Sequence, residues 1–270
     1  MASITDCVVE GLKYPFADIK KLLSFGALLA LIDVLYLVLS IKSLDGLRII
    51  KDIHMVNFSR LHGGDIGIIV LIGAIIFILH LVMMGYQYRL VKFSIKKKED
   101  LPGLNDIVDI LISGVKYFIV CAAYYLIPII VMVLGLMLVH DSSLVIYPMV
   151  IAGILFLIAS FVLIMALNNM VAHDKLAKAF DFGEIIDNIR NLGWVKYIGT
   201  VIFTFVVFII VMVAAGFVMS ILTVAFTNIV NNHAIFVAAF IGILEGLLIN
   251  SYGTIFLNRV FGSIYRESIK

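Results

Sequence analysis

Three ionisable residues lie inside long apolar runs of this sequence, where their side chains could carry chemistry. Asp33, His80 and Glu245 fall in the first, second and sixth of these runs. A charge at mid-membrane costs at least about 2.5 kcal/mol on insertion scales, so each group should face the protein interior and find a partner there. Because intramembrane ionisable groups commonly mark proton or ion pathways, transport is the first chemistry to consider.

Small and polar residues share the helical faces of these three groups. Asp33 shares its face with Gly26, Ala30, Tyr36 and Ser40, His80 with Gly73 and Gln87, and Glu245 with Gly242, Gly246, Asn250 and Gly253. Small residues let helices approach closely. The sequence therefore predicts an intramembrane polar centre of Asp33, His80 and Glu245. Two interpretations stay open, an ion or proton pathway and a buried polar clamp with a carboxyl held neutral by desolvation.

The chain that positions these residues has a composition suited to lipid. Of its 270 residues, 63% are hydrophobic and 14% are charged, whereas soluble proteins have about 25% charged residues. Runs long enough to cross a hydrocarbon layer of about 30 Å as helices occur at 22–41, 66–88, 117–139, 144–167, 198–226 and 234–257. We predict an all-α polytopic membrane bundle of six helices, with residues 1–270 as one membrane domain.

The distribution of Lys and Arg predicts the orientation of this bundle. Sixteen of these cations flank one side of the predicted spans and four flank the other, namely Lys42, Arg48, Lys51 and Arg60. Under the positive-inside rule the richer side faces the cytoplasm, and six crossings bring both termini to that side. We therefore expect a cell-membrane protein with both termini in the cytoplasm.

A short motif recurs before the first, third and fifth spans. Each copy has an apolar residue, any residue, an acid and Ile, and a glycine follows 8 or 9 residues after the acid. The motifs begin at Phe16, Leu104 and Phe182, and the glycines are Gly26, Gly114 and Gly193. Apolar residues at i, i+3, i+4 and i+7 in the later copies indicate amphipathic helices. We predict three repeats of surface helix plus transmembrane hairpin, at about 12–89, 101–170 and 180–260, related by rotation about the membrane normal. In each repeat the backbone should bend near the motif glycine, between the surface helix and the span.

The outer segment 43–65 is longer than the other predicted outer connections. Its apolar residues Leu47, Ile50, Ile53 and Val56 recur every third position. This spacing predicts a helix on the outer surface, and an ordinary interfacial helix is favoured over a lid above a central opening.

Two further groups of residues are candidates for ligand contact. Arg89, Lys92, Lys96, Lys97 and Lys98 would meet anionic lipid headgroups, although loop charge that only sets topology accounts for them more simply. Pro128 frees the carbonyl of Tyr124 in the middle of the third span. Tyr124, Tyr125, Pro128 and, from the last span, Asn250 are therefore candidates for lining a pocket, with a packing kink as the alternative.

No motif in the sequence indicates a cofactor, a metal site or catalysis. Asn169, His173 and Asp174 lack a further ligand at supporting spacing, and the polar end of a span at the membrane interface explains them better than a metal site. Asp106 with Asp109 fits a solvated helix face better than a divalent-ion site. Cys7 and Cys121 are expected to be free thiols. The Gly-rich phosphate loops, Gly-x-Ser-x-Gly elbows and His-Glu-x-x-His pairs of common enzymes are not present. We expect no catalytic residue, no cofactor and no nucleic-acid partner.

Two blocks of the sequence carry a resemblance to a known family. The markers are Gly85-Tyr86-x-x-Arg89, Leu101-Pro102, and the Ala172-His173 and Ala179-Phe180-Asp181-Phe182 block. In these residues the chain resembles a domain-of-unknown-function family of multi-pass membrane proteins found largely in archaea. The resemblance implies a membrane location, and it carries no activity and no catalytic residue to this chain.

Two functions remain as hypotheses. The first is a small-solute or ion transporter or channel with Asp33, His80 and Glu245 as its polar centre. The second is a non-catalytic membrane scaffold or partner subunit, whose surface helices and basic loop engage lipid headgroups or other, unknown proteins. A water-accessible cavity near Glu245 favours the first hypothesis, and a solid bundle favours the second.

Overall fold

The computed structural model describes residues 4–47, 63–139, 144–229 and 234–269, and helices make up nearly all of these ranges. Among the described residues there is no strand. Six helices are long and apolar enough to cross a membrane: Ile19–Ser40, Ile66–Ile95, Ile107–Leu138, Ile146–His173, Trp194–Thr227 and Ile235–Ser268. These findings confirm the all-α bundle of six long apolar helices, and the protein is a multi-pass membrane protein.

The helices follow one another along the chain with short breaks. The first half forms α1 (Ile4–Lys13), the 3₁₀ helix η1 (Tyr14–Ala17), α2 (Ile19–Leu47), α3 (Gly63–Ile95) and α4 (Ile107–Leu138). The second half forms α5 (Ile146–His173), the 3₁₀ helix η4 (Leu176–Phe180), α6 (Phe182–Leu192), α7 (Trp194–Ile229), α8 (Ala234–Leu244), the π-helix η5 (Glu245–Asn250) and α9 (Ser251–Ser268).

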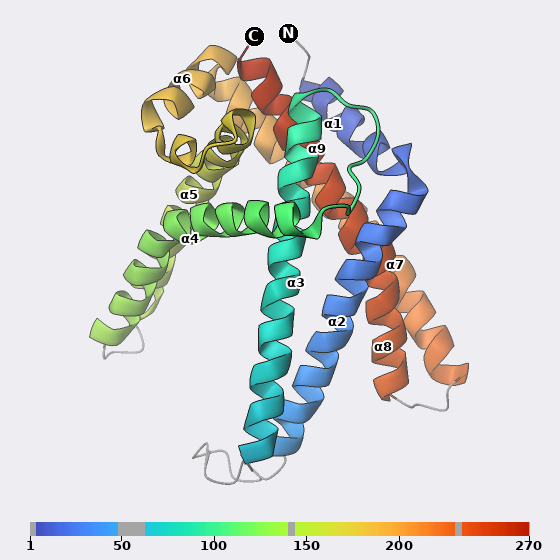
Figure 1. The fold of residues 1–270 in the computed structure, drawn as a ribbon. Helices are drawn as coiled ribbons and strands as arrows, with labels where there is room; N and C mark the ends of the chain where they lie inside the picture. Colours follow the sequence, from blue (N-terminus) through green and yellow to red (C-terminus); the bar gives the residue numbers. More distant parts are fainter. Residues whose placement is uncertain (1–3, 48–62, 140–143, 230–233, 270) are drawn as a thin grey trace.

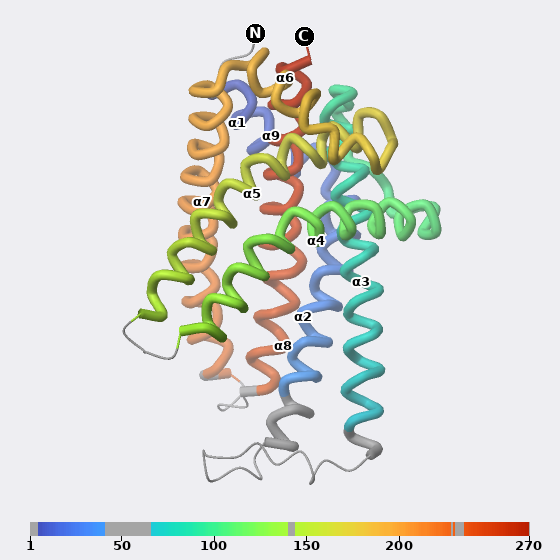
Figure 2. The backbone as a smooth tube through the Cα atoms, turned by 90° about the vertical axis from the view of Figure 1, so that its left-hand side faces the viewer, coloured from blue at the N-terminus to red at the C-terminus, as the bar shows by residue number. Residues whose placement is uncertain are grey.

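Several long helices share one general direction, and α1, α6 and the end of α9 gather at one end. In Figure 1, α3 runs from top to bottom, α2 and α7 descend toward the bottom and α8 lies near the bottom, while α1, α6 and the end of α9 lie at the top. Figure 2 shows the same grouping from the side. We call this end, which holds α1 and the end of α9, the terminal end.

The helix α4 takes a different path from its neighbours. Its first half runs across α3, and its second half turns and descends beside α5 (Figures 1 and 2). Pro128 lies inside α4 and removes one backbone hydrogen bond, which permits a bend. Four apolar residues near the start of α4 are exposed at the surface of the chain: Ile107, Val108, Ile112 and Val115. In a membrane protein this face meets lipid rather than a protein core.

The breaks predicted at the motif glycines are present at one of three positions. Gly193, with a φ of 91°, separates α6 from α7 as predicted. The predictions at Gly26 and Gly114 are wrong, because α2 and α4 run through these residues without interruption. The helix α1 precedes the first motif, and the backbone breaks at Asp18, between η1 and α2. The rotational relation among three repeats stays a prediction.

Gly26 and Gly114 are packing positions rather than hinges. A Cβ on Gly26 would overlap the backbone of Leu247, and a Cβ on Gly114 would overlap the backbone of Leu81. Gly246 likewise lies against the backbone of α2 at Ala30, so its small size permits the close packing expected from its spacing with Gly242. The glycines therefore bring α2 against η5 and α4 against α3.

An ion-paired group joins the two ends of the chain. Glu10 of α1 accepts from Arg259 at 2.7 Å and from Arg266 at 2.9 Å, both on α9. The Arg259 side chain is only 4% exposed, lies 4.0 Å over the ring of Tyr14 and donates to the carbonyl oxygen of Lys98 at 2.6 Å. Around this group α1, α5, α6, α7 and α9 form the largest buried apolar cluster, so the core sits toward the terminal end.

The predicted outer helix at 43–65 lies mostly outside the described residues. The α2 helix extends to Leu47, and Ile50, Ile53 and Val56 fall in the range 48–62 that the structure does not describe.

Candidate functional site

Asp33 and His80 line one pocket among the membrane-crossing helices. The pocket has a volume of about 290 Å³, and its walls come from α2, α3, α7, η5 and α9. Tyr36 and Asn250 also line it, and the apolar part of the wall includes Phe208. The structure thus brings together two of the three residues predicted for the polar centre, at the depth of the spans.

The hydrogen-bond partner of the Asp33 carboxylate is an amide and not a cation. Asn250 Nδ2 donates to Asp33 Oδ2 at 3.3 Å, and no salt bridge to Asp33 occurs within the described residues. The Cβ of Asp33 packs 3.7 Å from the position that a Cβ on Gly242 would take. Its carboxylate therefore keeps most of its acceptor capacity, which a cation or a proton could use.

The ring of His80 is oriented by its own helix. His80 Nδ1 lies 2.9 Å from the carbonyl oxygen of Ile76, a geometry in which Nδ1 donates. This tautomer leaves Nε2 as the acceptor. The ring of Tyr36 meets the imidazole edge to face at 5.8 Å between centroids. The His80 ring is thus held in a fixed orientation in the wall of the pocket.

Glu245 is close to this pocket but does not line it. It is the first residue of the π-helix η5 and is half-buried. The charges of Glu245 and His80 both act on Asp33, but among the described residues no hydrogen bond or ion pair joins the Glu245 side chain to Asp33 or His80. π-Helical turns are rare and are often found at functional sites. Asn250, the last residue of η5, is the one that contacts Asp33.

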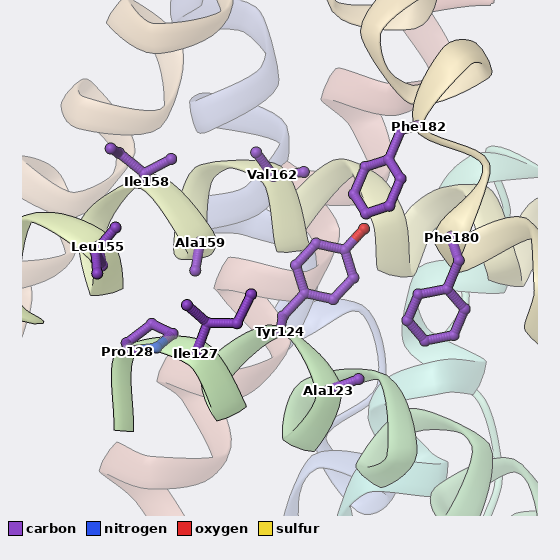
Figure 3. Close-up of a pocket in the computed structure, with 10 residues that line it drawn as sticks. All are labelled: Ala123, Tyr124, Ile127, Pro128, Leu155, Ile158, Ala159, Val162, Phe180 and Phe182. Atoms are coloured by element: carbon purple, nitrogen blue, oxygen red, sulfur yellow. The ribbon is translucent and has the colours of Figure 1, made fainter. Parts of the chain in front are cut away.

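The aromatic residues predicted to line a pocket are divided between two environments. Tyr124 and Pro128 line an apolar pocket of about 280 Å³ between α4 and α5, closed at one end by Phe180 and Phe182 (Figure 3). Tyr125 is not part of its lining; its hydroxyl lies 3.1 Å from Ser160 Oγ. Asn250 lines the Asp33 pocket instead.

The five cations predicted to meet lipid headgroups differ in their surroundings. Arg89 pairs with Asp109 at 2.8 Å, and Lys92 pairs with Asp174 at 3.1 Å. Lys96, Lys97 and Lys98 are exposed, and the ammonium of Lys98 lies 4.3 Å over the ring of Phe93. Three of the five cations thus remain at the surface for contact with headgroups.

Sequence reasoning missed the role of Asp174, which it treated as the polar end of a span. Asp174 ends α5 in a left-handed conformation with a φ of 54°. It accepts from Tyr88 Oη at 2.5 Å and pairs with Lys92 and Lys116. These interactions, led by the Tyr88 hydrogen bond, lower the pKa of Asp174 to about 2. These partners lie on α3 and α4, and only the three-dimensional structure shows that both helices lie close to Asp174.

The residues considered as metal ligands are engaged by other partners: His173 Nδ1 lies 3.0 Å from the backbone carbonyl oxygen of Asn169. Asn169 accepts from Tyr265 Oη at 2.6 Å, and His173 Nε2 lies 3.3 Å from Glu184. Over the described ranges, no three His, Cys, Asp or Glu side chains are grouped closely enough to hold a metal ion.

Comparison with known proteins identifies the family. The searches of curated proteins and of solved structures returned no match. The family described as "Protein of unknown function (DUF4013)" matches residues 66–224, a range that includes His80 and Arg89 but neither Asp33 nor Asn250. Since the match covers more than half of the sequence, this membrane protein belongs to the DUF4013 family.

Proposed function

We propose that this protein moves a small solute or an ion across the membrane by way of the pocket that Asp33 and His80 share. The observation that carries this function is the Asp33–Asn250 hydrogen bond inside a pocket that His80 also lines. A carboxylate at membrane depth with one amide partner is a binding group for a proton or a cation.

The surrounding groups support passage as well as binding. His80 presents an acceptor nitrogen to the same pocket, and Glu245 lies within electrostatic range of Asp33. A cation held between the two carboxylates would offset their mutual repulsion in a poorly hydrated site. In this proposal Asp33 of α2 binds the cation, and Glu245 at the start of η5 is the next acceptor.

We further propose that the terminal end faces the cytoplasm of the cell and that the protein performs no catalytic step. The orientation is supported by the position of the cations: the surface lysines Lys96, Lys97 and Lys98 follow α3 at the terminal end.

The test is a flux measurement in reconstituted vesicles. Purified protein is placed in liposomes with an internal pH-sensitive dye, and an ion gradient or membrane potential is imposed. We expect a flux that Asp33→Asn abolishes and that Glu245→Gln reduces, because each amide keeps the shape but cannot take up a proton.

The matched control is Asp187→Asn, which alters an exposed acid on α6 with its partner Arg190. This control should leave the flux at the wild-type rate. Wild-type flux in the Asp33→Asn protein would remove the site from the mechanism. If the wild-type protein moves no proton, metal cation or small solute, transport is ruled out and the scaffold function takes its place.

A further inference from the structure

A second polar pocket lies at the terminal end, where α4 crosses α3. Its volume is about 360 Å³, and it is separate from the Asp33 pocket. Three cations and three acids line it: Arg89, Lys92, Lys116, Asp106, Asp109 and Asp174. Its formal charge is therefore zero, which does not favour a simple anion or a simple cation as its ligand.

Two of these charged residues, Arg89 and Asp109, are already paired with each other. Arg89 donates from Nη1 to the carbonyl oxygens of Gly103 at 3.1 Å and Asn105 at 2.5 Å, and from Nη2 to Asp109 at 2.8 Å. Only 16% of the Arg89 side chain is exposed. Arg89 and Asp109 thus form the wall that fixes the 103–106 segment to α3.

Free hydrogen-bond donors converge on one side of the pocket. Lys92 and Lys116 share Asp174, at 3.1 Å and 3.4 Å, so each ammonium keeps donors for another acceptor. Ser113, one turn before Lys116 on α4, is 6% exposed, and its hydroxyl makes no hydrogen bond within the described chain. Its oxygen is not sealed from solvent, so it can donate to a ligand in the pocket.

The pocket is also lined by a hydrogen-bond acceptor that has no partner of its own. Asp106 has no hydrogen bond or ion pair through its carboxylate among the residues that the structure describes. Its backbone is left-handed, with a φ of 57°, and its side chain caps no helix. The pocket therefore offers donors at Lys92, Lys116 and Ser113 and an acceptor at Asp106, which suits a ligand with an anionic group and an ammonium.

The surface around the pocket indicates where such a ligand comes from. The first half of α4 exposes apolar side chains, with Val108 at 72% and Ile107 at 56%, and Ile112 of the same face also lines the pocket. A helix of this kind lies at the boundary between lipid tails and headgroups. The pocket thus opens beside a lipid-facing surface, where headgroups carry both phosphate and ammonium.

We propose that this pocket binds the headgroup of an aminophospholipid. The phosphate is held by Lys92, Lys116 and the Ser113 hydroxyl, and the primary ammonium is held by the Asp106 carboxylate. This site is independent of the transport site and does not rest on it.

Binding is measured with delipidated protein in detergent and three short-chain lipids that bear phosphoethanolamine, phosphocholine or phosphoglycerol. Native mass spectrometry counts the retained lipids, and the rise in melting temperature gives the affinity by mass action. We expect the phosphoethanolamine lipid to bind about tenfold more tightly than the phosphocholine lipid, because a quaternary ammonium donates no hydrogen bond to Asp106.

Two variants separate the two ends of the ligand. Asp106→Asn should abolish this preference, and the fold should persist because Asn tolerates a left-handed backbone. Lys116→Gln should weaken the phosphoethanolamine and phosphocholine lipids equally, by about tenfold. The matched controls are Asp187→Asn and Lys20→Gln at exposed positions outside the pocket, which should leave the affinities at wild-type values.

Other results overturn the assignment. Equal binding of the phosphoethanolamine and phosphocholine lipids by the wild-type protein would show that Asp106 recognises no ammonium. Tightest binding of the phosphoglycerol lipid would show an anion site instead. If free O-phosphoethanolamine binds as tightly as the lipid, the ligand is a soluble molecule and not a membrane headgroup.

Discussion

Gly85 of α3 and Gly114 of α4 face each other where the two helices cross. The position of a Cβ on Gly114 lies 3.1 Å from the backbone nitrogen of Gly85 and overlaps the carbonyl of Leu81, while a Cβ on Gly85 would overlap the carbonyl of Ile110. The two helix backbones are in direct contact at this point, and only glycine, whose side chain is a hydrogen atom, fits between them.

Replacing this glycine should therefore loosen the crossing. Gly114→Ala is expected to destabilise the protein by about 1–3 kcal/mol, the range for overpacking against atoms that cannot move aside. The matched control is Gly153→Ala on α5, where an added Cβ meets nothing within 4 Å. That control should be neutral or stabilising by up to about 1 kcal/mol. Thermal unfolding in detergent compares the two variants, and equal melting temperatures would contradict the close crossing.

The ion-paired group at Glu10 should make stability depend on pH. Burial raises the pKa of Glu10, but the Arg266 hydrogen bond and the charges of Arg259 and Arg266 outweigh it, so the pKa lies below its usual value. A lowered carboxyl pKa stabilises the fold above the unfolded-state pKa of about 4.3, and this stability is lost as the pH falls through the folded-state pKa.

The variant Glu10→Gln should accordingly melt at a lower temperature than wild type at pH 7. The difference should shrink as the pH falls below about 4, where the wild-type carboxylate takes up a proton. Melting curves of both proteins across this pH range provide the measurement. A difference that stays constant with pH would show that the charge of Glu10 contributes nothing.

The buried hydrogen bond between Tyr265 and Asn169 gives a third test. Tyr265 is 1% exposed, and its hydroxyl donates to Asn169 Oδ1 at 2.6 Å. Tyr265→Phe should cost about 1–3 kcal/mol because it leaves a buried acceptor without its donor. Tyr147→Phe is the control, since that side chain is 63% exposed. A loss no larger than that of the control would show that Asn169 finds another donor.

Cysteine labelling tests the proposed orientation. Cys7 is a poor target, since it is buried and burial raises the pKa of its thiol. In a protein without Cys7 and Cys121, a cysteine at Lys97 should resist an impermeant reagent added outside whole cells, and one at Ser142 should react. Ser142 lies outside the described residues, so this expectation comes from the distribution of cations alone. The opposite labelling pattern would reverse the orientation.

The six membrane-crossing helices could be predicted because hydrophobic length is a property of each segment alone. The packing between segments could not. Gly26 and Gly114 were interpreted as breaks because they share spacing with Gly193, yet glycine serves equally at a break and at a close crossing. Nothing in the local sequence distinguishes the two uses, since the difference lies in what the partner helix places nearby.

The candidate site could likewise be predicted from the sequence only in part. Residue counting along an ideal helix gives depth, which is enough to single out Asp33 and His80. It does not give partners: Asp33 and Asn250 are 217 positions apart, and Asp174 finds Tyr88 86 positions away. Such pairs are set by which helices become neighbours, which is decided by the whole chain.

The π-helical stretch Glu245–Asn250 makes the Asp33 pocket tolerant of a change in chain length. A π-turn closes its hydrogen bond over one more residue than an α-turn, so η5 takes up an extra residue while α8 and α9 keep their packing faces. Removing Leu248, which is half exposed, would restore α-helical spacing. Asn250 and Arg259 follow this position and would keep the faces that meet Asp33 and Glu10, because the residue removed is the one that the π-turn had taken up. The same deletion within an α-helical stretch would instead turn every residue after it by about 100° around the helix axis.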